Sequence, residues 1–228
     1  MHKHTLWLLP IASVLMAAAP ANSITERMRE QIVAQARSLD PARLTFERTT
    51  NMERVGGGSR TKTIKVERWD GKSWTLASLN GRVPTASEKR EAEKQAAAMP
   101  VPGYHRLASL LAATTETSID AQGRTVLHIP VLPTGAVQTD AKDISSHLSA
   151  TATLGMKDGK AWVQTLAVKA REPFKLNFLI KVTSFEQTNE YKLDASGQPR
   201  LMAQANDSIG TMFGYSGGQK SEVVYAYR

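Results

Sequence analysis

The sequence predicts a mainly β (α+β) fold, with about nine to eleven antiparallel strands and three helices. Apolar and polar residues alternate most clearly from 148 to 156, which is the period of a half-buried strand. Asp-Gly or Asn-Gly pairs at 70–71, 80–81 and 158–159 separate strand-like segments, and such pairs favour tight hairpin turns. Strand-like and helical segments do not alternate along the chain, so we do not expect a parallel βαβ sheet.

The start of the chain has the three parts of a secretory signal: a basic Lys3 region, an apolar run from Leu6 to Ala19, and an Ala19-Pro20-Ala21 cleavage site. A retained membrane anchor is the alternative, but the run is shorter than the roughly twenty residues that span a bilayer. We therefore expect residues 1–21 to be removed after Ala21. Residues 22–228 then form a single domain without a transmembrane segment, in a periplasmic or secreted location.

The composition excludes several classes of site and of partner. The chain has no cysteine, which excludes disulfides, cysteine-bound zinc, a thiol nucleophile and a lipid on an N-terminal cysteine. Its net charge of +8 is spread among acidic residues, as in the run 88–91, and no block of five like charges occurs. A well-solvated surface is the simplest interpretation. Contact with an anionic membrane surface stays open, and no nucleic-acid partner is expected.

Three segments have helical patterns. In 24–39 apolar residues recur at helical spacing, and Asp40-Pro41 ends the segment. The segment 86–99 is rich in good helix formers, with Thr85 or Ser87 as its cap. Its apolar face is thin, so this helix either packs permanently or moves aside. A third helix is expected at 104–113, where Leu107, Leu110 and Leu111 share one face.

The remaining segments are strand-like or loops. In 178–193 the apolar parity shifts between Val182 and Phe185, which predicts a bulge. The stretch 133–147 is the candidate long loop or lid, while 56–59 and 215–218 are interpreted as a loop and a flexible turn. The expected strands are 43–54, 61–69, 73–79, 114–120, 124–132, 148–156, 162–169, 178–193, 200–213 and 219–228.

The sequence offers few candidate catalytic or metal-binding residues. The histidines at 105, 128 and 147 lack the local spacing of a zinc site, and Asp140 with Asp143 is too small a set for calcium. Neither a Gly-x-Ser-x-Gly motif nor a Gly-rich phosphate loop ending in Gly-Lys-Ser/Thr occurs. We therefore predict no catalytic residue, no metal and no cofactor, and we expect the chain not to be an enzyme.

The order of these parts, together with three stretches, resembles the LolA/LolB-like superfamily of periplasmic outer membrane lipoprotein-sorting proteins. The stretches are 67–74, 80–85, and 173–175 with the strand through Lys181-Val182. The resemblance implies a curved antiparallel half-barrel over 22–228, with the N-terminal and two central helices covering its concave face. In that family the cavity receives acyl chains. This chain lacks the lipid-bearing cysteine of the anchored member, and no position matches the carrier's acyl-handling arginine.

The expected function is therefore binding of an apolar ligand, a lipid or an acylated protein, in the cavity of the curved sheet, as in a lipoprotein or lipid carrier. An envelope interaction or scaffold protein without a small ligand is the alternative. An envelope hydrolase is a third class. The residues expected to line the cavity share apolar strand parity or the helix face turned toward the sheet: Phe46, Trp74, Leu107, Leu110, Leu154, Phe178 and Ile180.

Overall fold

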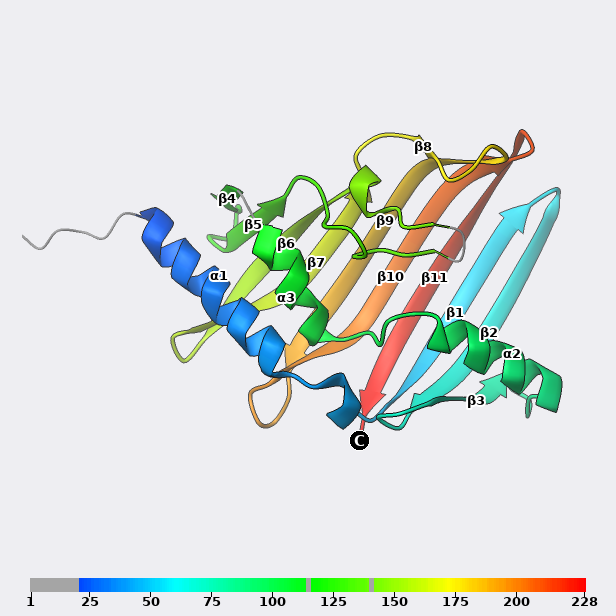
Figure 1. Ribbon diagram of the computed structural model, residues 1–228, viewed down its shortest axis with the longest axis horizontal. Coiled ribbons are helices and arrows are strands. Elements are labelled where there is room, and N and C mark those ends of the chain that lie inside the picture. The colour runs from blue at the N-terminus through cyan, green and yellow to red at the C-terminus, as the bar shows by residue number, and fades with distance from the viewer. Residues whose placement is uncertain (1–20, 114–115, 140–141) are drawn as a thin grey trace, which may run out of the picture.

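The computed structural model describes residues 21–113, 116–139 and 142–228 (Figure 1). Residues 1–20 of the expected export signal (1–21) and Asp140 lie outside this part of the chain. The described residues form one sheet of eleven strands: β1 (Phe46–Gly56), β2 (Ser59–Trp69), β3 (Trp74–Leu79), β4 (Glu116–Ile119), β5 (Thr125–Ile129), β6 (Leu148–Lys157), β7 (Lys160–Ala170), β8 (Phe174–Lys175), β9 (Ile180–Leu193), β10 (Pro199–Met212) and β11 (Tyr215–Tyr227).

The strands run in the order β3-β2-β1-β11-β10-β9-β7-β6-β5-β4, with the short β8 beside β9. Every pair of neighbours is antiparallel. The C-terminal strand β11 pairs with β1, which joins the first and second halves of the chain in one sheet. The sheet does not close, because β3 and β4 are its two edges. The predicted fold class, an open curved half-barrel with helices, is confirmed.

The helices lie on one face of the sheet (Figure 1). No helix of the described residues is long and apolar enough to cross a membrane. The expected third helix is divided into short 3₁₀ and α turns. The helices are α1 (Ala21–Ser38), α2 (Ala86–Ala97) and α3 (Leu107–Leu110), and the 3₁₀ turns are η1 (Pro41–Arg43), η2 (Tyr104–Arg106), η3 (Leu111–Ala113) and η4 (Ser145–His147).

The main core lies between α1, α3 and the strands β5 to β7. Ile32 and Ala36 of α1 are fully buried, as is Leu107 of α3. Tyr104 is also buried, and its hydroxyl oxygen accepts a hydrogen bond from the Val163 N–H at 3.0 Å. This bond satisfies a buried main-chain donor of β7 and ties η2, the turn that leads into α3, to this half of the sheet.

α2 packs against the sheet differently from α1 and α3. It begins with the predicted Thr85 cap, which forms a reciprocal capping box with Glu88. Its buried residues are the two alanines Ala92 and Ala96, and a cleft of about 340 Å³ remains between the helix and β3. Small side chains therefore make the whole apolar contact of this helix, as the sequence predicts.

The turns follow the predicted chemistry at two of three sites. Asn80 and Asp158 both have positive φ, with a positive-φ glycine after each, as a type I′ turn requires. The turn at Asp70-Gly71 is different, because only Gly71 has positive φ. There the Asp70 carboxylate accepts hydrogen bonds from the main-chain N–H groups of residues 72 and 73. The Asp70 side chain thus stabilises this turn, whereas the Asp-Gly pair predicts a type I′ backbone conformation.

Two predictions about β9 to β11 have opposite outcomes. The bulge between Val182 and Phe185 is confirmed, since Ile209 lies opposite residue 184 and Gly210 opposite Val182. The flexible turn expected at 215–218 is wrong. These residues open β11, and the chain reverses at Phe213 and Gly214, both with positive φ. Glycine-rich sequence was interpreted as a turn, whereas here it lies inside a strand.

Candidate ligand-binding site

A large groove of the concave face lies at the end of the sheet that holds the β1–β2 and β10–β11 turns, and it borders the core at Ile144 and Phe185. Its volume is about 890 Å³. The walls come from the β10–β11 and β1–β2 hairpins, the start of β9, and three loop residues, Thr139, Ile144 and Leu176. Most of the lining is apolar, and the side chains that supply it are Ile144, Leu176, Ile180, Val182, Phe185, Met212 and Tyr215.

Three glycines in register explain why this end is hollow. Gly56 of β1 lies opposite Gly217 of β11, which in turn lies opposite Gly210 of β10. Directly opposed residues share a face of the sheet, so this row leaves a strip of floor without side chains. A Cβ on Gly210 would lie 2.3 Å from a main-chain oxygen of β9, and one on Gly217 would lie 2.8 Å from an oxygen of β1. Close strand approach thus requires glycine at these two positions.

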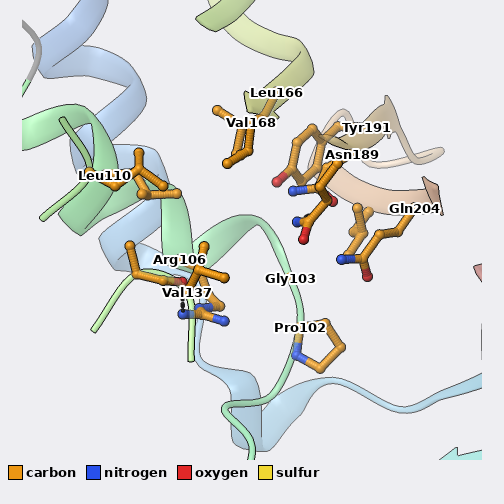
Figure 2. Close-up of a pocket in the computed structure, with 14 residues that line it drawn as sticks. Pro102, Gly103, Arg106, Leu110, Val137, Leu166, Val168, Asn189, Tyr191 and Gln204 are labelled. Atoms are coloured by element: carbon orange, nitrogen blue, oxygen red, sulfur yellow. Dashed lines mark hydrogen bonds between the residues drawn. The ribbon is translucent and has the colours of Figure 1, made fainter. Parts of the chain in front are cut away.

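A second, much smaller cavity lies beside η2 and α3. Its volume is about 70 Å³. Figure 2 shows the Arg106 guanidinium on one side of it and the amides of Asn189 and Gln204 on the other. Leu110 and Val137 add apolar surface from the helix and the loop. The cavity therefore combines a cation and two amides with an apolar surround.

Arg106 is held by the long loop. One guanidinium nitrogen, Nη2, donates to the Ala136 carbonyl oxygen at 2.9 Å and to the Gly135 oxygen at 3.4 Å. Among the described residues, no carboxylate lies within ion-pair distance of Arg106. Burial lowers the pKa of this guanidinium below its ordinary value, yet arginine stays protonated at physiological pH. The site thus carries a positive charge that is partly removed from water.

A row of polar side chains crosses the floor toward this cavity. Glu67 is only 6% exposed and accepts a hydrogen bond from the Arg48 guanidinium at 2.8 Å. The same guanidinium lies 4.0 Å from the centre of the Trp74 ring. Next in the row is Tyr225, whose hydroxyl donates to the Gln204 Oε1 at 3.2 Å. Burial raises the pKa of Tyr225 to about 12, so the hydroxyl remains a donor. Arg48 interrupts the run of apolar residues on the inward face of β1. Its contacts with Glu67 and Trp74 explain why a charged residue stands there.

The groove and the cavity adjoin. Gln187 lines the cavity and Asn206 lines the groove, and the two lie directly opposite each other on β9 and β10. On the loop side, the Ile144 N–H at the groove donates to the Val137 carbonyl oxygen at the cavity, at 3.1 Å. The concave face therefore changes from apolar to polar at one boundary between the two hollows.

The seven residues expected to line a cavity are distributed over four environments. Leu110 lines the small cavity and Ile180 lines the groove. Phe178 is 90% exposed, in the turn that precedes β9, where the Asn177 side chain accepts from the N–H groups of residues 179 and 180. The other four belong to the filled core: Phe46, Trp74, Leu107 and Leu154.

Sequence reasoning missed the glycine row and Arg106. Gly210 and Gly217 lie inside predicted or actual strands, and an isolated strand glycine is a signal of close backbone approach. Arg106 carries no comparable signal, because its place depends on a loop thirty residues later in the chain.

The remaining polar groups do not gather into a metal or catalytic cluster. Within the described ranges, no three His, Cys, Asp or Glu side chains lie close enough to hold a metal ion. His128 lies in β5 as expected, and its Nε2 is 2.7 Å from the Ser118 hydroxyl oxygen. This pair is exposed on the edge of the sheet, outside both hollows.

No family model and no curated protein matches the chain. Among solved structures, it is similar to a DUF1329 family protein from Desulfovibrio piger, with 8% identity, a TM-score of 0.23, and coverage of 88% of this chain and 93% of that one. It is also similar to a LolA superfamily protein from Nitrosomonas europaea, with 8% identity, a TM-score of 0.22, and coverage of 87% and 91%. Likeness at these scores does not assign the chain to either family.

Proposed function

We propose that this protein binds an apolar ligand, the acyl chain of a lipid or of a lipid-modified protein, in the groove floored by Gly56, Gly217 and Gly210. One observation carries the proposal: a groove of about 890 Å³ whose lining is mainly apolar is open to solvent. Its size falls within the range of about 300–1,000 Å³ that small-molecule sites have. The groove lies at the end of the sheet that holds the β10–β11 turn, whereas the sequence predicts a cavity under the helices.

The energetics favour an acyl chain as the occupant. Apolar side chains that face water in the free protein, such as Met212 and Tyr215, would be covered by the ligand. Burying a chain of sixteen carbons contributes on the order of 10 kcal/mol at about 0.8 kcal/mol per CH₂, before the cost of association is subtracted. The floor also lacks side chains that would have to move aside.

The proposal includes a cellular setting. The export signal expected at the start of the sequence supports a periplasmic or secreted location.

Phe178 and Phe213 are both exposed beside the groove, where the Phe213 N–H donates to the Leu179 oxygen at 3.1 Å, and Lys181 is adjacent. Exposed rings beside a cation suit an anionic membrane surface. Flotation with anionic and neutral vesicles tests this contact, and equal binding to both would contradict it.

Replacing Ile180 with Glu tests the groove itself. A carboxylate in the apolar lining disfavours an acyl chain because the charge would lose its hydration. We expect the affinity for an environment-sensitive naphthylamine dye, and its displacement by palmitate, to fall at least about tenfold, which is 1.4 kcal/mol.

The matched control is Val224→Glu. Val224 is 57% exposed on β11 and pairs with residues on the opposite face of the sheet from the groove. This variant should bind dye as the wild type does, and circular dichroism should show the same strand content in both variants. If delipidated wild type takes up no dye and gains no thermal stability from any acyl ligand, the proposal fails. An interaction or scaffold role without a small ligand then takes its place.

A further inference from the structure

We propose that the small cavity at Arg106 binds the carboxylate of a long-chain fatty acid whose alkyl chain lies in the groove. This inference rests on the proposed function and adds the charge, the class and the orientation of the ligand. The head would lie inward, beside α3, and the tail would point toward the β10–β11 turn.

Arg106 has the donors that a carboxylate needs. Only Nη2 is used by the loop carbonyls, and Nε and Nη1 donate to no described residue. A guanidinium without an acidic partner, placed at the edge of a cavity, is unusual because a partly buried charge is normally paired. Charge-assisted bonds from Arg to a carboxylate are among the stronger polar contacts in proteins.

Gln204 supplies a second donor. Its Oε1 accepts from the Tyr225 hydroxyl, which leaves the amide nitrogen for the cavity side. The Tyr225 hydroxyl is protonated at physiological pH and remains the donor, so the amide oxygen of Gln204 stays turned toward it. The acceptor of Gln204 is therefore occupied within the protein, whereas its donor is available to an anion (Figure 2).

The size of the cavity selects the class of headgroup. One water needs about 10–15 Å³ of such space, so about 70 Å³ accommodates a carboxylate with a few waters. A glycerophosphate headgroup has many more atoms and does not fit. The position of the cavity selects the orientation, since the opposed residues Gln187 and Asn206 place it next to the apolar groove.

Two ligands with the same alkyl chain but different headgroups distinguish the contribution of the carboxylate from that of the chain. Palmitate and hexadecanol should each displace the naphthylamine dye from wild type, palmitate at lower concentration. In Arg106→Gln the dissociation constant for palmitate should rise about tenfold or more, as expected when a hydrogen bond to a charged group is lost. The constant for hexadecanol should stay within about twofold. Arg106→Lys, which keeps the charge, should lie between the two.

Arg29→Gln is the matched control. Arg29 is also a partly buried arginine that donates to a main-chain oxygen, at 3.0 Å, but it lies on α1 away from both hollows. It should leave both constants unchanged. Unchanged hexadecanol binding shows that Arg106→Gln is folded. If Arg106→Gln weakens both ligands equally, or neither, the carboxylate assignment is wrong while the groove stands. If neither ligand displaces dye from wild type, the groove proposal fails as well.

Discussion

The two ends of the concave face share strands but differ in what fills them. Over β5 to β7, side chains of α1 and α3 pack onto the sheet and form a core in which Leu107, Leu127 and Leu148 are fully buried. At the end of the sheet that holds the β10–β11 turn, none of the described α-helices lies over the strands (Figure 1), and a row of glycines leaves part of the floor without side chains. The same strand β9 runs from buried Tyr191 at one end to half-buried Ile180 at the other. Side-chain size and helix position, rather than strand pairing, thus divide the face into a core and a groove.

The largest difference between the two ends should appear in stability. Leu107→Ala removes a fully buried side chain from the core. We expect a loss of about 2–5 kcal/mol in the free energy of unfolding, because the packed surroundings cannot collapse into the space. Ile180→Ala, in the groove, should cost clearly less because its side chain already faces an open hollow.

Urea denaturation of both variants measures the contrast. Equal losses would mean that the groove is packed in solution as tightly as the core. That result would contradict the division of the concave face into a core and a groove.

A smaller effect is expected from filling the groove. Gly56 has no positive φ, and a Cβ there meets only the Cα of Gly217, at 3.8 Å. Gly56→Ala and Gly56→Val should therefore fold, with unfolding free energies within about 1 kcal/mol of wild type. Dye affinity should fall in the order Gly, Ala, Val, reaching about tenfold for valine, which is 1.4 kcal/mol.

Uptake that is insensitive to side-chain size at 56 would show that the ligand does not lie over the glycine row. A comparison variant is Thr50→Val, on the same strand and the same face but outside the groove lining. It should bind dye as the wild type does.

Sequence alone predicted most of the fold because its signals are local. Alternation at 148–156 marked β6, and Asn80-Gly81 marked a hairpin turn. The parity shift after Val182 marked a bulge that the register of β9 with β10 confirms. These features depend on residues near one another in the chain.

The site was harder to predict because it depends on residues far apart in the chain. Phe46 and Leu154 have the same apolar parity as Ile180, and the three-dimensional packing around each residue decides which of them is core. The row of Gly56, Gly210 and Gly217 forms only when β1, β11 and β10 pair in register. Parity identifies the inward face, but it does not locate the hollow on that face.

The position of the bound chain is the central claim, and a brominated fatty acid tests it directly. Tyr215 lines the groove and is 72% exposed, so Tyr215→Trp places an indole at the site with little effect on packing. The described residues include three native tryptophans. Trp69 and Trp74 lie at the opposite end of the β1–β2–β3 meander, and Trp162 lies at the start of β7, beside the Leu193 end of β9 and away from Ile180. Bromines on the chain quench indole fluorescence on contact. We predict that dibromostearate quenches the fluorescence that Tyr215→Trp adds, saturably and with unlabelled palmitate as competitor, while the fluorescence of wild type changes little. Quenching confined to the native tryptophans, or absent from both proteins, would contradict binding in the groove.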